Sequence, residues 1–433
     1  MSTLDAGESP PERGVFVNRT TNLRSVQAIG YDMDYTLLHY NVELWEQAAF
    51  THACHRLDEF GWPVSDLEFD AEAFSLGLTF DLELGNLVKA TRFGYVVRAQ
   101  HGAKRLSFDE QRQAYAGTVV DLADDRFEFM NTLFELSRAC LWTQLVDLFD
   151  AGRLRSVRSY AEVYRAVDSA LNQAHIEGAL KAEITANPDR FIDPDPEIVQ
   201  TLMDQRTAGK RLLLITNSEW QYTQFMMAHA VDPYCGEGTW RDLFDMVIVS
   251  ANKPRFFSGQ NQLHRIVDED LTLMQPHRGP LDPGSVYFGG NAKLVEETLG
   301  ISSEQLLYVG DHLFGDVHVS KDALRWRTAL IARELESEVR DAINFAPKEA
   351  ELVQLMAEKV RVDRRQAQLR MARQRGDDAS DLDAVTREAI KLDERVAPLA
   401  RAAAEVGHKL WGPLMRAGND KSLFARQVER YAD

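Results

Sequence analysis

Short apolar runs that end abruptly in polar residues recur along the chain, and they have the length of buried strands. Helical segments separate several of them. This alternation predicts an α/β fold with a doubly wound, mostly parallel sheet, in which ligands bind at the carboxyl ends of the strands. The six runs are Val26–Tyr31, Leu212–Ile215, Met246–Val249, Val286–Phe288, Leu306–Val309 and Trp326–Ala332.

A long insertion separates the first run from the second. Its roughly 180 residues are too many for a loop. Most of the insertion has helical character, and one stretch, Leu87–Arg98, is more typical of strands. We therefore expect a catalytic core of residues 16–40 and 206–335, interrupted by a large, mainly helical cap of residues 41–205. The expected helical stretches are Glu43–Phe60, Phe127–Ala151 and Ala161–Ala182.

The chain becomes strongly helical and charged after the last run. Leu352–Arg375 and Ala384–Val406 are separated by a polar interruption at Gly376–Asp381, which predicts a helical hairpin within an extension of residues 336–410. The charge pattern favours a solvated hairpin, with an oligomer contact as the alternative. Residues 411–433 are expected to return to the core. Residues 1–15, rich in Pro, Gly and acidic residues, are expected to form a disordered leader.

The amino-acid composition limits the kinds of binding partner that we expect for this protein. The formal net charge of −18 disfavours nucleic acid and anionic membranes. Three widely spaced cysteines contain no CxxC pair, so neither a disulfide framework nor a zinc site is indicated. No apolar run is long enough to span a bilayer, and the first residues lack the pattern of a signal peptide. We expect a cytoplasmic protein that binds a small molecule.

Four motifs at predicted strand ends carry candidate chemistry. Each is ambiguous alone, since paired Asp residues are common in turns, Ser218 and Gln221 have the spacing of a helix capping box, and an isolated lysine is usually solvated. In chain order the motifs are Asp32-Met33-Asp34-Tyr35-Thr36-Leu37, Thr216-Asn217-Ser218, Lys253 before a proline, and Gly310-Asp311-His312-Leu313-Phe314-Gly315-Asp316.

Convergence of the motifs would bring four carboxylates together, from Asp32, Asp34, Asp311 and Asp316. Each pair at about 4 Å would repel by about 4 kcal/mol at an effective dielectric near 20. A hard cation relieves this repulsion, and oxygen ligands without a His or Cys cluster favour Mg²⁺ over zinc.

The four motifs in this order resemble those of the haloacid dehalogenase superfamily. Further segments narrow the resemblance to the cytosolic purine 5'-nucleotidases, which prefer IMP and GMP. The segments that carry this narrower resemblance are Phe16–Arg19, Asn131–Phe134, Gly178–Lys181, Tyr287–Gly290, Gly310–Asp316, Trp326–Thr328 and Leu423–Asp433.

The resemblance implies a hydrolase of purine nucleoside 5'-monophosphates that works through an aspartyl-phosphate. Asp32 would be the nucleophile and Asp34 the general acid and base. The metal ligands would be Asp32, the backbone carbonyl of Asp34, and Asp311, with Asp316 orienting metal-bound water. The phosphoryl group would be held by Thr216, Asn217 and Lys253.

The cap is where the chain departs from this family. Phe134, Asn172, His175 and Lys181 are the candidate substrate residues, but an arginine and an aspartate near the family's base site align with Asp168 and Asn172. Two positions that are basic in the nucleotide-activated animal enzymes are here Asp121 and Asp322. An ATP-type effector site is therefore doubtful.

Three functions remain open from the sequence. The first is a 5'-nucleotidase, with phosphate transfer to a nucleoside hydroxyl as a side activity. The second is a phosphatase of another small phosphomonoester, and the third is a non-catalytic binding protein. The resemblance also implies a homo-oligomer, either a dimer or a tetramer.

Overall fold

The computed structural model describes residues 10–176 and 178–433, apart from the side chains of His175 and Ile176. The chain divides into two compact units. One comprises Phe16–Ala332 with Ala417–Asp433, and the other comprises Arg333–Arg416 with the amino-terminal residues up to Val15.

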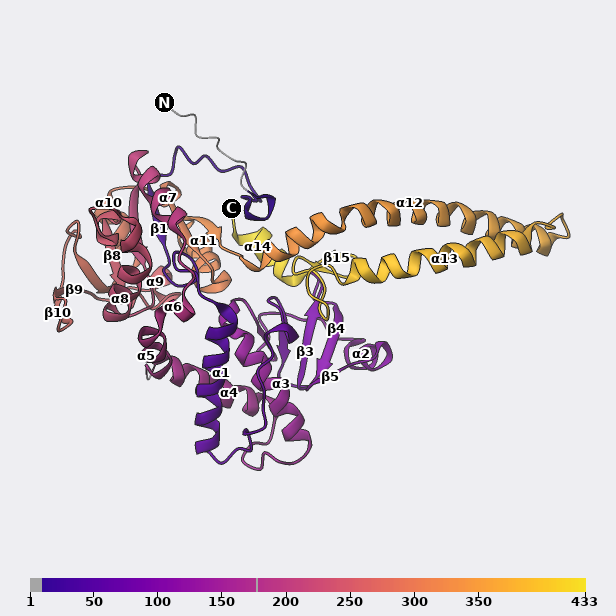
Figure 1. Ribbon diagram of the computed structural model, residues 1–433, viewed down its shortest axis with the longest axis horizontal. Coiled ribbons are helices and arrows are strands. Elements are labelled where there is room, and N and C mark those ends of the chain that lie inside the picture. Colours follow the sequence, from indigo (N-terminus) through magenta and orange to yellow (C-terminus); the bar gives the residue numbers. More distant parts are fainter. Residues whose placement is uncertain (1–9, 177) are drawn as a thin grey trace. The chain divides into compact units, whose positions relative to one another are not determined.

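The larger unit contains an eight-stranded sheet in the order β10-β9-β11-β8-β7-β1-β12-β13, of which β1, β8, β9 and β10 are labelled in Figure 1. All six predicted runs are strands and pair in parallel, which confirms the predicted fold class. They are β1 (Ala28–Tyr31), β7 (Arg211–Ile215), β8 (Met246–Val249), β11 (Val286–Gly289), β12 (Leu306–Gly310) and β13 (Arg327–Leu330).

Two antiparallel strands at one edge were not predicted. These are β9 (Leu263–Asp268) and β10 (Leu273–Pro276). In β9 only Leu263 and Ile266 are buried, and β10 is exposed throughout, so neither contains a continuous apolar run.

Helices and short turns connect the core strands. They pack on an apolar core that includes Leu213, Ile248, Tyr287 and Trp326. The core helices are α7 (Pro196–Thr207), α8 (Trp220–Val231), α9 (Arg255–Ser258), α10 (Ala292–Leu299), α11 (Val319–Leu324) and α14 (Leu423–Tyr431), with η4 (Asp232–Tyr234), η5 (Trp240–Leu243), η6 (Ser303–Gln305), η7 (Leu313–His318), and the small strands β14 (Arg416–Ala417) and β15 (Asp420–Lys421).

The insertion after β1 combines helices with a second sheet. The helices are α1 (Val42–Glu59), α2 (Phe108–Tyr115), α3 (Leu136–Asp150), α4 (Tyr160–Ile176), α5 (Ala179–Ala186) and α6 (Pro188–Phe191), with turns η2 (Ala71–Ala73) and η3 (Leu133–Glu135). The antiparallel sheet has the order β5-β4-β3-β2-β6, formed by β2 (Thr79–Asp81), β3 (Asn86–Ala90), β4 (Val96–His101), β5 (Lys104–Arg105) and β6 (Phe127–Phe129).

The sequence prediction understated this second sheet. The strand-like stretch Leu87–Arg98 does form most of the β3–β4 hairpin, but the helix predicted from Phe127 is wrong at its start, because Phe127–Phe129 pairs with β2. The strands have two to six residues and turn at left-handed glycines such as Gly85 and Gly94. Strands this short do not show a clear alternation of polar and apolar residues.

The smaller unit contains the predicted hairpin, in which α12 (Glu334–Arg375) and α13 (Leu382–Ala404) lie side by side (Figure 1). α12 begins 18 residues before the predicted start at Leu352. Residues 1–9 of the predicted leader lie outside the described residues, whereas Pro11–Arg13 form a 3₁₀ turn, η1, whose Glu12 pairs with Arg340 at 3.2 Å.

Candidate active site

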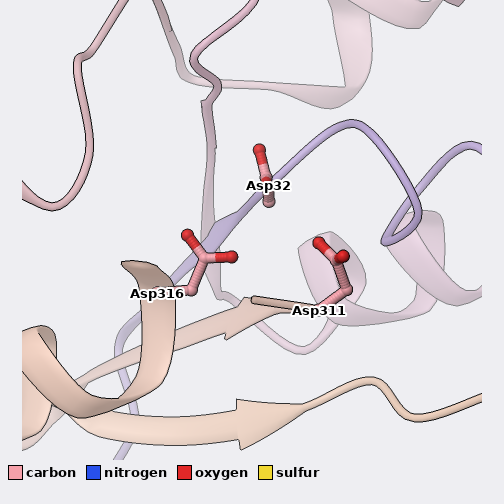
Figure 2. Close-up of side chains that lie close together, drawn as sticks. All are labelled: Asp32, Asp311 and Asp316. Carbon is pink, nitrogen blue, oxygen red and sulfur yellow. The ribbon is translucent and has the colours of Figure 1, made fainter. Parts of the chain in front are cut away.

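The carboxyl ends of neighbouring parallel strands bring the motif residues together. Asp32 follows β1, Asp311 follows β12, and the two strands pair in register with Tyr31 opposite Val309. The Asp32 N–H donates to the Val309 carbonyl at 2.9 Å, which extends this pairing by one residue. Figure 2 shows the side chains of Asp32, Asp311 and Asp316 close together at these strand ends.

Lys253 lies between two of these carboxylates. Its Nζ is 2.8 Å from Asp32 Oδ1 and 2.9 Å from Asp316 Oδ1, and all three side chains are almost completely buried. Burial alone would lower the pKa of Lys253, but Asp316 and Asp32 raise it well above its ordinary value. The ammonium therefore stays charged.

Tyr308 of β12 supports this lysine. Its hydroxyl accepts from Lys253 Nζ at 3.0 Å and donates to the Ile215 carbonyl at 2.9 Å. The Tyr308 ring lies against Gly30 of β1, where a Cβ would come within 2.9 Å of the ring. Glycine at this strand position therefore makes room for the tyrosine that supports Lys253.

A second glycine makes room for Asp316. A Cβ on Gly310 would lie 2.4 Å from Asp316 Oδ2, closer than atoms can approach. Asp316 Oδ2 also accepts the His312 N–H at 3.2 Å. The His312 ring accepts from the Gly315 N–H through Nδ1 at 2.7 Å, so it stabilises the turn of the motif.

The three grouped carboxylates have the properties of a cation site. Asp32, Asp311 and Asp316 each offer an oxygen within 4.8 Å of the others, and the Lys253 ammonium lies against two of them. Burial, followed by repulsion from Asp316 and Asp32, raises the pKa of Asp311 well above its ordinary value. A divalent cation would remove this repulsion, and an all-oxygen donor set fits Mg²⁺.

The Asp34 carboxylate is held by two hydroxyl groups. Tyr40 Oη donates to its Oδ1 at 2.6 Å, and Ser218 Oγ donates to its Oδ2 at 2.7 Å. The capping box predicted for Ser218 is therefore wrong, because α8 begins at Trp220 with Glu219 as its N-cap. Burial and the nearby Asp32 raise the pKa of Asp34, while these two hydrogen bonds lower it.

Asn217 binds the backbone of the lysine loop. Its Oδ1 accepts from the Lys253 N–H at 2.6 Å, and its Nδ2 donates to the Lys253 carbonyl at 3.2 Å. Thr216 is completely buried, and its Oγ1 accepts the Ser218 N–H at 3.0 Å. The side chain of Asn217 thus positions Lys253.

The predicted cap residues lie in different environments. Phe134 is half-buried and contacts the rings of Tyr35 and Trp45, with centroid distances of 5.0 and 5.2 Å. Thr132, two residues earlier, donates to Asp311 Oδ2 at 3.3 Å. The 131–134 segment therefore connects the cap directly to the cluster of carboxylates.

Lys181 of α5 points toward α8 of the core. Its Nζ lies 2.6 Å from a Glu219 carboxylate oxygen and 4.6 Å from the centroid of the Tyr222 ring. Asn172 donates to Asp168, a carboxylate that also pairs with Arg138 at 2.8 Å.

The side chain of His175 lies outside the described residues. Its role as a substrate residue therefore stays a prediction from the sequence. Asp121 and Asp322, at the two positions where the animal enzymes are basic, are both exposed.

Several residues at the site were missed by sequence reasoning. Tyr40, Tyr222 and Tyr308 place their hydroxyl groups around Asp34 and Lys253, and Thr132 reaches Asp311. None lies within a catalytic motif. For Tyr308, the glycine at the paired position of β1 was a usable signal, since a glycine inside a strand often marks close approach of another group.

Comparison with known proteins adds independent information. The family model described as "5' nucleotidase family" matches residues 15–433. The human and rat proteins named "5'-nucleotidase domain-containing protein 2" are 29% and 28% identical over 340 residues, which is 75% of this chain and 64% and 60% of theirs. A 5'-nucleotidase domain-containing protein of Dictyostelium discoideum is 26% identical over 352 residues, which is 79% of this chain and 59% of that protein.

The chain thus spans less than two thirds of the length of these relatives. Among solved structures, one described as a predicted phosphoglycolate phosphatase from Haemophilus somnus and a haloacid dehalogenase-like hydrolase from Xanthomonas campestris are each 12% identical, with TM-scores of 0.28. They cover 70% and 71% of this chain and 84% and 83% of theirs.

Proposed function

The chain belongs to the 5' nucleotidase family, and from this premise we propose that it is a phosphoric monoester hydrolase that removes phosphate from purine nucleoside 5'-monophosphates. The observation that carries the proposal is the buried group in which Lys253 lies within 2.9 Å of both Asp32 and Asp316, with Asp311 beside them. Such a group combines a carboxylate nucleophile with positive charge for a phosphoryl group.

In this proposal Asp32 attacks phosphorus and becomes the aspartyl-phosphate. Burial, and to a lesser extent Asp316, raises the pKa of Asp32 to about 6 against the opposing effect of Lys253. The carboxylate is therefore largely ionised at neutral pH, as a nucleophile must be. Lys253 keeps the crowded carboxylates ionised and places positive charge where the phosphoryl oxygens would lie.

Asp34 donates a proton to the leaving 5'-oxygen and then accepts one from the water that hydrolyses the aspartyl-phosphate. The raised pKa of Asp34 supports the first step, because a proton is retained on the carboxyl more readily. Tyr40 and Ser218 hold both oxygens of Asp34 in place, so the same group is oriented for both steps.

Asp32, Asp311 and Asp316, with the backbone carbonyl of Asp34, would hold Mg²⁺ directly or through water. When bound, the ion neutralises charge on the transferring phosphoryl group. In the Thr216–Ser218 turn, the Asn217 N–H would bind a remaining phosphoryl oxygen, since the Asn217 side chain is engaged by Lys253. The N–H groups of Thr216 and Ser218 already donate to the Ile248 carbonyl and to Thr216 Oγ1.

Substrate selection is assigned to the cap. Lys181 is placed to contact a substrate that displaces its partner Glu219, and Phe134 offers a half-buried ring beside the carboxylates. The altered pair Asp168 and Asn172 keeps a second candidate open, a phosphatase of another small phosphomonoester. Phosphate transfer to a nucleoside hydroxyl is a side reaction of the same intermediate.

The reaction is proposed to take place in the cytoplasm, consistent with three free thiols. Every helix of the described residues is too short or too polar to cross a lipid bilayer.

The test is phosphate release from a panel of nucleoside monophosphates and sugar phosphates, with Mg²⁺ or EDTA. We expect metal-dependent release that is strongest with IMP or GMP and lost in Asp32→Asn, and unchanged in a control at an exposed acid, Asp270→Asn. Mass spectrometry of acid-quenched protein should detect phosphate on Asp32. Release from sugar phosphates alone would favour the second candidate, and no release from any substrate would overturn both.

A further inference from the structure

Helix α12 carries an exposed apolar face in addition to the face that packs on α13. Ile343, Val353, Val360 and Met371 are each exposed by about half or more, with Val353 at 62%. These are large aliphatic side chains on a helix that is otherwise strongly charged. Exposed apolar residues that recur on one helix face mark an interaction surface.

The spacing of these residues is that of a coiled coil. Starting at Ile343, steps of three and four residues lead to positions that are apolar in every case but one, and all of them are exposed. Four heptads are enough to define a coiled-coil seam. We name this set the outer seam: Ile343, Ala346, Ala350, Val353, Ala357, Val360, Arg364, Ala367 and Met371.

The outer seam faces away from α13. The residues of α12 that pack on α13 form a separate seam of Leu352, Leu355, Val362 and Leu369. With 3.5 residues per turn, the two seams are centred roughly 155° apart around the helix. Pro347 belongs to neither seam. The hairpin therefore buries the apolar residues on one side of α12, and α13 does not cover the outer seam on the other side.

Charge is divided between the two halves of α12. Glu334–Gln354 contains six acidic and two basic residues, whereas Leu355–Arg375 contains two acidic and seven basic residues. A second α12 running in the opposite direction would place each acidic half against a basic half. A parallel arrangement would oppose like charges along the whole helix.

We propose that the outer seam of α12 pairs antiparallel with the same seam of a second copy of this chain. Helix α12 supplies both the apolar surface and the complementary charge. In a dimer with two-fold symmetry, each contact between the two helices occurs twice. The alternation of alanines with larger residues lets the two helices approach closely. The proposal rests on the hairpin alone and is independent of the proposed enzymatic activity.

Sedimentation equilibrium of the full chain tests the association. We expect a mass of about twice 49.0 kDa for the wild type. Val360→Glu should weaken the dimer by at least about 100-fold, because it places a charge in the seam. Ile390→Glu on α13 is the matched control, since Val360 and Ile390 are both 54% exposed, and it should leave the mass unchanged. Far-UV circular dichroism reports whether each variant keeps its helices.

A wild-type chain that sediments at the mass of a single copy at about 100 μM would overturn the proposal, because a functional dimer binds more tightly. So would a dimer that persists unchanged in Val360→Glu, or one that Ile390→Glu disrupts equally.

Crosslinking tests the relative orientation of the two α12 helices. It uses Ala→Cys changes, which do not place a charge in the outer seam. A chain with Ala350→Cys is mixed with a chain carrying Ala367→Cys and treated with a flexible bismaleimide that tolerates one heptad, about 10 Å, of register difference. An antiparallel pair should link the two different chains, whereas a parallel pair would link identical ones. The unmodified chain, which contains three cysteines, is the control. Links between identical chains only, or no links beyond the control, would overturn the antiparallel arrangement.

Discussion

Glu46 on α1 is a carboxyl group that the cap buries completely. The Ser137 N–H donates to its Oε2 at 2.6 Å, and Oε1 has no hydrogen-bond partner among the described residues. Burial raises the pKa of Glu46 to about 7, although the bond from Ser137 favours the charged form. We predict that Glu46→Gln removes a pH dependence of stability that the wild type shows.

The sign follows from the pKa in each state. The folded carboxyl titrates near 7 and the unfolded one near 4.5, so between these values the folded state binds more protons and becomes less stable as pH rises. The difference between these two pKa values corresponds to about 3 kcal/mol, of which about 2.5 kcal/mol is lost between pH 5 and pH 8. A glutamine side chain is neutral at every pH in this range, so the variant does not lose this stability as the pH rises.

The measurement is thermal unfolding of wild type and Glu46→Gln at pH 5 and pH 8. The difference in stability between the two proteins should change by about 2.5 kcal/mol in favour of the variant at pH 8, or about 3 °C for a chain of 433 residues. Any fixed cost of the amide cancels in this comparison. Glu43→Gln, at an exposed position of the same helix, should show no such change. Equal shifts for Glu46→Gln at both pH values would refute the reasoning.

Three further predictions concern the candidate site. Lys253→Met should abolish phosphate release and lower stability by about 3–5 kcal/mol in chemical denaturation, because Asp32 and Asp316 lose their buried countercharge. Gly310→Ala should reduce kcat at least about tenfold in steady-state assays, because its Cβ would displace Asp316. Saturating Mg²⁺ at about 100 times its Kd should stabilise the protein by about 2.7 kcal/mol in thermal unfolding, and Asp311→Asn should remove most of this gain.

Matched controls separate these effects from general damage. Lys293→Met changes an exposed lysine of α10 and should leave activity and stability near wild type. Gly117→Ala adds a Cβ that meets no atom within 4 Å and should retain kcat. Activity in Lys253→Met, equal losses for the two glycine variants, or Mg²⁺ stabilisation that survives in Asp311→Asn would each contradict the corresponding prediction.

The core sheet and the grouping of the motifs could be predicted from local patterns along the chain. Parallel strands need continuous apolar runs because both faces are buried, and such runs are visible in a single sequence. Asp32 and Asp311 stand at the ends of two of these runs. Since parallel strands end at the same edge of a sheet, their meeting followed from local information.

The hydrogen-bond partners of the remaining polar groups, in contrast, depend on long-range packing. Ser218 was predicted to cap a helix but binds Asp34, 184 residues away along the chain. Asn217 was expected at the phosphate but holds the Lys253 backbone. Local spacing allows several hydrogen-bond partners for such short side chains, and the choice depends on which distant strand or loop packs beside them.

The cap and the hairpin also combine features that the local sequence predicts with features that depend on tertiary contacts. The short strands of the second sheet have too few residues for a clear period, so their pairing depends on contacts across the cap. Most of α12 and α13 was readable as helix in the sequence. Which side of α12 packs on α13, and which side stays exposed, was decided by the hairpin, because a helix with two apolar seams can bury either one.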